Sequence, residues 1–208
     1  MKKGLLITFE GLDGSGKTTQ IREFIKQLED NHIDYQLFRE PGGTKIGEKI
    51  RDILLDKNNI EMSEVAELLL YSASRNQLSI KKIRPALMNN KIVICDRFYD
   101  STTAYQGHAR KLDLEFIQSL NRVAADNLIP DITFLLDISL EERKNRLDNK
   151  KLDRLEQEAG EFHRRVRQGF LNLAKHNQDR FFVINGTQPI DLIRDQIWSK
   201  FQEKYTTE

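Results

Sequence analysis

The sequence is poor in cysteine, which excludes several kinds of site. Its single cysteine, Cys95, lies within the apolar run KIVIC. One thiol cannot form an intrachain disulfide or hold a cysteine-based metal cluster. A free cysteine behaves as a small apolar side chain and is usually buried. We therefore expect Cys95 to be a buried thiol.

Neither sign of charge dominates the sequence. Its 33 Lys and Arg residues nearly cancel its 32 Asp and Glu residues, which leaves a formal net charge of +1. A chain with this balance has no global field that would recruit DNA, RNA or an anionic membrane surface. We expect no nucleic-acid partner and no membrane partner, and we expect any anion to bind at a local site.

Long hydrophobic runs, repeats and linkers are also missing. The N-terminal stretch MKKGLLITFEG breaks at Glu10, before it could serve as a signal peptide or a membrane span. This pattern predicts a cytoplasmic protein. No low-complexity tract or Pro-rich linker marks a domain boundary. A chain of 208 residues with 38% hydrophobic residues can bury one core, which predicts a single domain.

Short apolar runs alternate with amphipathic stretches along the chain. The five runs are LLITF from Leu5, YQLF from Tyr35, KIVIC from Lys91, ITFLLDI from Ile132 and FFVIN from Phe181. The stretches between them show apolar spacing of three and four, as in Phe162, Val166, Phe170, Leu173 and in Ile190, Ile193, Ile197, Phe201. Parallel strands need helical crossovers, and these cover both faces of the sheet. The pattern predicts an α/β three-layer sandwich with a five-stranded parallel sheet.

One predicted helix, EVAELLLYSASR from Glu64, carries two apolar stripes. Val65, Leu68 and Leu69 form one stripe, and Ala66, Leu70 and Ala73 form another beside it. Two apolar faces need two partners. The helix is either buried within the fold, or its second face packs on a twin subunit in a homodimer.

A glycine-rich motif follows the first apolar run directly. Residues 11–18 match the pattern G-x-x-x-x-G-K-[ST] between a strand and a helix. Such glycines let the backbone turn with its N–H groups inward, and the helix start adds the positive end of its dipole. We expect a nucleotide phosphate site, with Lys17 on the β and γ phosphates and Thr18 on Mg²⁺. The expected phosphate-binding residues are Gly11, Leu12, Asp13, Gly14, Ser15, Gly16, Lys17, Thr18 and Thr19.

An acidic residue, Asp96, ends the run KIVIC. Open parallel sheets present ligand groups at the carboxyl ends of their strands, so Asp96 is expected to hold Mg²⁺ beside Thr18. The alternative is a surface carboxylate that caps the next helix. Kinases, GTPases and motor-like ATPases all use this phosphate loop. A GTPase would also need an Asn-Lys-x-Asp segment, and the nearest string, residues 149–153, misses that spacing by one. A small phosphotransferase becomes the leading class.

Several separated motifs resemble those of the bacterial thymidylate kinases. They are FEGLDGSGKTTQ around the phosphate loop, REPGGT from Arg39, DRFYDSTTAYQG from Asp96 and LDRLEQE from Leu152. The resemblance implies a P-loop nucleoside monophosphate kinase fold and transfer of the γ-phosphoryl group of ATP to dTMP, in dTTP synthesis. It also implies a mobile lid at about residues 147–160. The homodimer that we expect rests on the two apolar stripes of the helix from Glu64.

The resemblance further implies which residues bind the acceptor. Arg97 and Arg51 would hold the acceptor phosphate, and Asp13 would accept from the 3′-hydroxyl. Tyr71, often Phe in the family, would stack on thymine, and Arg75 would donate to a thymine carbonyl. The implied dTMP-binding residues are Asp13, Arg39, Pro41, Arg51, Tyr71, Arg75, Arg97, Thr102, Tyr105 and Gln106. A cis peptide bond before Pro41 would also fit the family.

The donor side is implied in the same way. Some family members carry an arginine in the phosphate loop, but Gly14 occupies that place here. The lid would then supply the catalytic arginine, with Arg154 as the first candidate and Arg146 as the second. Each could instead form a salt bridge in a highly charged segment. Asn185, Gly186 and Thr187, which follow the last run, are implied to line the adenine.

Two alternative functions stay open at this point. A deoxynucleoside kinase or another monophosphate kinase on the same fold would keep the phosphate loop and Asp96 but change the acceptor contacts. A nucleotide-sensing module without transfer activity would bind ATP tightly but release no ADP in response to an acceptor. The many arginines expected on the acceptor side favour an enzyme over such a module.

Overall fold

The computed structural model of the chain describes residues 4–148 and 153–207. Five strands are present: β1 (Leu6–Glu10), β2 (Tyr35–Arg39), β3 (Ile92–Asp96), β4 (Ile132–Asp137) and β5 (Phe181–Asn185). The helices are α1 (Lys17–Asp30), α2 (Lys45–Leu55), α3 (Glu64–Leu78), α4 (Arg84–Met88), α5 (Tyr99–Thr102), α6 (Leu114–Ala124), α7 (Leu140–Leu147), α8 (Gly160–His176) and α9 (Ile190–Thr207), with π-helical segments η1 (Ser79–Ile83) and η2 (Thr103–Ala109). Within these ranges, no helix has the length and apolar character needed to cross a membrane.

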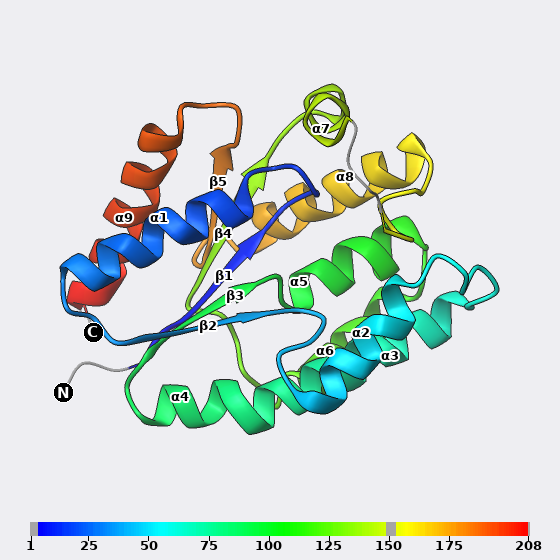
Figure 1. Cartoon of the computed structure of the whole chain (residues 1–208), viewed down its shortest axis with the longest axis horizontal. Helices are drawn as coiled ribbons and strands as arrows, with labels where there is room; N and C mark the ends of the chain where they lie inside the picture. The colour runs from blue at the N-terminus through cyan, green and yellow to red at the C-terminus, as the bar shows by residue number, and fades with distance from the viewer. Residues whose placement is uncertain (1–3, 149–152, 208) are drawn as a thin grey trace.

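The five strands form one parallel sheet in the order β2-β3-β1-β4-β5 (Figure 1). Each expected run therefore forms a strand, although β1 and β3 begin one residue later and extend to Glu10 and Asp96. The connection from β1 leads to β2 on one side of the sheet, and the connection from β3 crosses β1 and leads to β4 on the other side. This reversal creates a crevice at the carboxyl ends of the strands, where open α/β sheets bind ligands.

Helices α1 and α9 cover one face of the sheet (Figure 1). Alternate strand residues such as Ile7, Phe9 and Phe134 point to this face and pack against Phe24 of α1. Phe201 of α9 packs edge-on against Phe24, with ring centroids 5.1 Å apart. The predicted stripe of α9 is buried, apart from its first residue, Ile190, which is 53% exposed.

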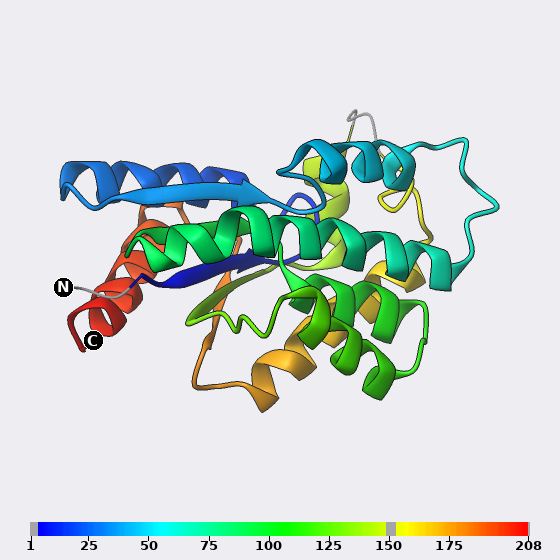
Figure 2. The ribbon, with the colours of Figure 1, turned by 90° about the horizontal axis from the view of Figure 1, so that it is seen from below.

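The opposite face of the sheet is covered in two parts. Leu6, Val93 and Cys95 pack under the rod formed by α3, η1 and α4, which Figure 2 shows as one continuous helical run. Leu135 and Phe181 pack under η2 and α8, together with the predicted α8 stripe. Cys95 is a buried free thiol, as expected. The sequence prediction of a three-layer sandwich is confirmed.

Helix α3 has one face inside the fold and one outside. Leu68 is fully buried, whereas Val65 and Leu69 are 49% and 48% exposed. Ala73, one turn after Leu69, is also exposed. The exposed face of α3 thus combines Val65 and Leu69 of the first predicted stripe with Ala73 of the second, whereas Ala66 and Leu70 are half-buried. No described residue covers this face, and the twin-subunit interpretation stays a prediction.

Candidate active site

A cavity of ≈ 650 Å³ opens at the carboxyl ends of β1, β2 and β3. Its walls come from the phosphate loop, the turn after β2, helix α3 and the segment after β3. All ten residues expected to bind the acceptor line this cavity: Asp13, Arg39, Pro41, Arg51, Tyr71, Arg75, Arg97, Thr102, Tyr105 and Gln106. Motifs that are far apart in the sequence are thus brought around one space.

The phosphate loop needs glycine where its backbone enters the left-handed region, as at Gly11 and Gly16. Gly11 has φ +137°, and a Cβ there would lie 2.4 Å from the carbonyl oxygen of Leu136. Gly16 has φ +100° and occupies the N-cap of α1. None of the first-turn residues of α1, Lys17 to Gln20, is acidic, so the positive end of the helix dipole is free to attract an anion.

Lys17 lies at the base of the loop. Its ammonium donates to the carbonyl oxygens of Gly11 at 3.1 Å and Leu12 at 3.0 Å, and the residue is 7% exposed. Burial, followed by repulsion from Arg97, lowers the pKa of Lys17, while Asp13 acts in the opposite direction. The loop therefore holds a desolvated cation at the wall of the cavity.

Arg97 pairs with Asp13 across the cavity wall. Its Nη2 lies 2.6 Å from Asp13 Oδ1, and its Nη1 donates to the Gly11 carbonyl at 3.0 Å and to Ser101 Oγ at 3.1 Å. The hydroxyl of Tyr105 donates to Asp13 Oδ2 at 3.3 Å. Burial alone would raise the pKa of Asp13, but Arg97 and Lys17 outweigh it and hold that pKa well below its usual range. The loop carboxylate is thus ionised and can accept from a ligand hydroxyl.

A buried carboxylate that the sequence analysis missed, Glu10, contacts the segment that carries Arg97. Glu10, the last residue of β1, is fully buried and accepts from the Phe98 amide at 2.8 Å and from Ser101 Oγ at 2.6 Å. Ser101 in turn accepts from Arg97. These bonds fix the turn on which Arg97 adopts φ 71°. Glu10 was visible in the sequence only as the end of an apolar run, because its partners lie far away along the chain.

The raised pKa of Glu10 leads us to expect that the stability of the protein depends on pH. Burial, with a contribution from Asp100, raises its pKa from about 4.5 to about 7 against the opposing effect of Arg97. Because the folded protein holds this proton more tightly than the unfolded chain, the contribution of Glu10 to stability falls as pH rises from about 4.5 to about 7, by on the order of 3 kcal/mol. Chemical denaturation of the wild type and of Glu10→Gln across this range should show a slope that the variant lacks. Glu61→Gln, at an exposed position, is the matched control, and parallel curves for the wild type and Glu10→Gln would contradict the assignment.

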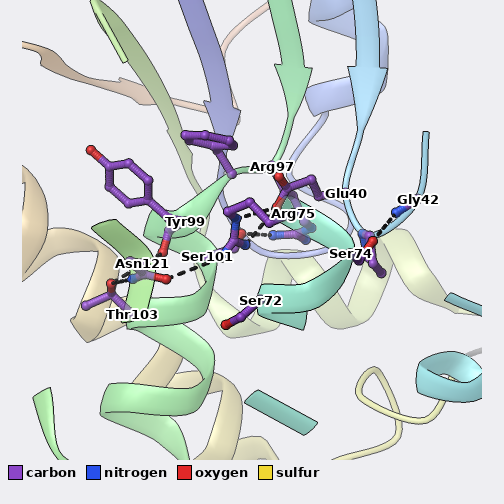
Figure 3. Close-up of polar contacts among 12 residues, drawn as sticks. Glu40, Gly42, Ser72, Ser74, Arg75, Arg97, Tyr99, Ser101, Thr103 and Asn121 are labelled. Carbon is purple, nitrogen blue, oxygen red and sulfur yellow. Dashed lines mark hydrogen bonds and ion pairs between the residues drawn. The ribbon is translucent and has the colours of Figure 1, made fainter. Parts of the chain in front are cut away.

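Arg75 is held rigidly in the wall below the crevice. Its Nε donates to Glu40 Oε2 at 2.8 Å, and its Nη1 donates to Asn121 Oδ1 at 3.2 Å. Figure 3 shows the guanidinium between these two partners, with Gly42 bonded to Ser74 close by. Arg75 is 1% exposed, so the pair is almost completely desolvated. These contacts use only part of the donors of the guanidinium, which leaves it able to bind a ligand as well.

The turn after β2 orients two further arginines toward the cavity. The peptide bond between Glu40 and Pro41 is cis, as the resemblance implied. The Pro41 carbonyl accepts from Arg39 Nη1 at 3.0 Å and from Arg51 Nη1 at 2.9 Å. Burial and the neighbouring Arg39 lower the pKa of Arg51. Two guanidinium groups so close together favour an anion between them.

Arg146 borders the donor side of the site. Its Nη1 donates to the Gly14 carbonyl at 3.2 Å and its Nη2 to the Gly186 carbonyl at 2.9 Å. It lines the main cavity and also a second one of ≈ 220 Å³, which Ser15, Thr19 and Gly186 line too. Asn185 and Thr187, expected at the adenine, line neither cavity in the described structure.

Arg154 contacts neither the phosphate loop nor Gly186 among the bonds of the described residues. Its Nε donates to the carbonyl of Leu54 at 2.9 Å, and its Nη2 lies 2.6 Å from Glu67 Oε2. It is not among the described residues that line either cavity. The neighbouring Leu155 and Glu156 do line the main cavity, so the segment borders the site although this guanidinium is bonded to Leu54 and Glu67. Part of the expected lid, residues 149–152, falls outside the described residues.

Comparison with known proteins identifies the relatives of this chain. Residues 9–197 match the family model described as thymidylate kinase. The chain belongs to the thymidylate kinase family. A thymidylate kinase of Thermoanaerobacter sp. (strain X514) is 47% identical over 195 residues, which cover 94% of this chain and 96% of that protein. That of Caldanaerobacter subterraneus subsp. tengcongensis is 46% identical over 201 residues, which cover 97% of this chain and 96% of that protein. That of Clostridium novyi is 42% identical over 200 residues, which cover 95% of this chain and 98% of that protein.

The family match spans every part of the site. The phosphate loop, the cis-proline turn, the α3 face and the Arg97 turn all lie within residues 9–197. The whole site therefore lies within the part of the chain that matches the family.

Proposed function

We propose that the chain is an ATP-dependent nucleoside monophosphate kinase that converts dTMP to dTDP in the synthesis of dTTP. One observation carries the proposal: the phosphate loop and the ten expected acceptor residues line a single cavity. Two polyanions must meet end to end for phosphoryl transfer, and guanidinium groups orient them by paired hydrogen bonds. The family match supports the same conclusion.

We assign the acceptor to the part of the cavity between α3 and the Arg97 turn. Arg97 and Arg51 would hold its phosphate, and Asp13 would accept from its 3′-hydroxyl. Tyr71 would stack on the base beside Arg75, because the two residues lie one turn apart on the same face of α3. Tyr105 would lie against the deoxyribose, where it disfavours a 2′-hydroxyl.

The donor ATP is assigned to the phosphate loop, with its adenine toward Gly186. Lys17 would hold the β and γ phosphates, and Arg146 would neutralise charge that develops during transfer. The segment at about residues 147–160 would act as a lid that limits water entry. No general base is required, since the attacking acceptor oxygen is already ionised.

The residues at the strand ends also fit Mg²⁺. Thr18 and Asp96 both line the cavity and offer a hydroxyl and a carboxylate oxygen. Mg²⁺ is usually held by one or two carboxylates together with waters and substrate phosphates, so two protein groups suffice. When bound there, the ion would neutralise the phosphate charge.

We further propose that the enzyme is a cytoplasmic homodimer. The exposed stripe of Val65, Leu69 and Ala73 on α3 supports pairing with a second copy. Sedimentation at micromolar concentration tests the assembly, and a monomeric mass would contradict it.

A panel of acceptors tests the reaction. ADP release is measured with ATP, Mg²⁺ and, in turn, dTMP, dUMP, dCMP, dGMP and thymidine. We expect turnover to be highest with dTMP. A preference for thymidine would indicate a nucleoside kinase, and ADP release that no acceptor increases would contradict a transferase.

A further inference from the structure

A nearly buried carboxylate on α3, Glu67, lies behind the acceptor pocket. Its side chain is 1% exposed, and it does not line the main cavity itself. It precedes Tyr71 and Arg75 by one and two helical turns, so the three side chains share one face of α3. Nothing in the sequence singled out Glu67, because its partners come from η2 and from the turn before α8.

One side of this carboxylate contacts the base pocket. Its Oε1 accepts from Gln106 Nε2 at 2.8 Å, and Gln106 does line the cavity. Burial alone would raise the pKa of Glu67, but the bonds from Gln106 and Arg110 outweigh it and lower that pKa. An ionised carboxylate can only accept, so it must receive the nitrogen of the amide. The carbonyl oxygen of Gln106 is then the end that remains for a ligand.

The other side of the carboxylate contacts the turn of residues 153–159. Its Oε2 lies 2.6 Å from Arg154 Nη2 and 3.2 Å from Arg110 Nη2. Arg110 also reaches Glu158 of the turn, at 2.6 Å. Leu155 and Glu156 of this turn line the cavity. Through Arg154 and Arg110, Glu67 therefore connects this part of the cavity wall to α3.

We propose that Glu67 is a positioning residue that fixes the Gln106 amide for base selection and holds the turn of residues 153–159 against the site. The selection rests on the proposed binding of dTMP in this cavity. Thymine presents an N–H at N3, which the carbonyl oxygen of Gln106 can accept. Cytosine presents a lone pair at N3, which that oxygen repels. Glu67 thus acts on the base without touching it.

Glu67→Gln tests both roles, with Glu64→Gln as the matched control. Glu64 lies on the same helix but is exposed. The neutral amide in Glu67→Gln can donate as well as accept, so Gln106 is free to turn its nitrogen toward the base. We expect the ratio of kcat/KM for dTMP to that for dCMP to fall by about tenfold. In the ligand-free protein, hydrogen exchange of residues 153–159 should become faster, because Arg154 and Arg110 lose their charged partner. Glu64→Gln should change neither quantity.

Arg154→Gln breaks the same contact from the other end. It should accelerate exchange in residues 153–159 to a similar extent, and the double variant should add little, because both changes remove one interaction. If Glu67→Gln melts below the assay temperature, Glu67→Asp replaces it, because the shorter side chain keeps the charge but withdraws the carboxylate from its partners. The ratio of kcat/KM for dTMP to that for dCMP should again fall, and exchange in residues 153–159 should again become faster.

The outcomes separate this inference from the proposed function. A wild type that does not phosphorylate dTMP would overturn the proposed function, while the exchange measurement needs no substrate and would still test the hold on the turn. If the wild type is active and either selectivity or exchange in Glu67→Gln equals that of Glu64→Gln, the carboxylate does not serve both sides and the inference fails.

Discussion

Replacing Lys17 with methionine is expected to lower kcat by about 10³-fold or more while the protein stays folded. The ammonium lies at the base of the phosphate loop, bonded to the Gly11 and Leu12 carbonyls, where it can turn to the β and γ phosphates. No other cation of the loop, residues 11–19, can take its place. Methionine keeps the apolar stem and removes only the charge.

The melting temperature distinguishes a catalytic loss from a folding defect. Because burial lowers the pKa of Lys17, the charged form costs free energy in the folded state. Lys17→Met should therefore melt at the same temperature as the wild type or higher, as is common where function requires a desolvated charge. Lys26→Met is the control: it lies on the same helix, its side chain is 63% exposed, and its loss should leave kcat unchanged. Activity that survives in Lys17→Met would remove the lysine from the mechanism.

Local patterns were enough to predict the sheet, the phosphate loop and Asp96, whereas the acceptor side of the cavity wall was implied by the resemblance to thymidylate kinases. The phosphate loop is contiguous in sequence, so its strand, turn and helix could be read directly from Gly11 to Thr18. Asp96 could be placed because parallel strands end at one edge of the sheet. Tyr71 and Arg75 could be placed together because residues four apart share a helix face. In each case the relevant neighbours are close in sequence or are aligned by the sheet.

The charged network behind the wall could not be predicted in this way. Glu10 bonds to Ser101, 91 positions away, and Glu67 bonds to Gln106 and Arg154, 39 and 87 positions away. Such contacts depend on how α3, η2 and the turn before α8 pack together, and no local spacing encodes that. For the same reason the sequence could suggest lid arginines but could not say which of them faces the phosphates.

The two candidate arginines have different surroundings in the structure. Arg146 pairs with Glu142 through its Nε at 2.6 Å, but its two terminal nitrogens bond to the carbonyls of Gly14 and Gly186, and it borders both cavities. Arg154, the first candidate from the sequence, bonds to Glu67 and the Leu54 carbonyl. An arginine that stabilises transferring phosphoryl charge must reach the phosphates, and such a group can contribute roughly 10³ to 10⁵ in rate. The geometry therefore favours Arg146, and the assignment stays a prediction until the two are compared directly.

Arg146→Ala is expected to lower kcat by about 10³-fold, whereas Arg154→Ala should lower it by less than about tenfold. Each variant serves as the control for the other, because both remove a guanidinium of the proposed lid region. Single-turnover measurements with saturating ATP and dTMP separate the transfer step from product release. A larger loss in Arg154→Ala would contradict the assignment, because the turn would then have to carry Arg154 from Glu67 to the phosphates in each cycle. In that case Glu67→Gln, which releases Arg154, should speed up rather than slow down the transfer step, so the two results together identify which guanidinium acts on the transferred phosphoryl group.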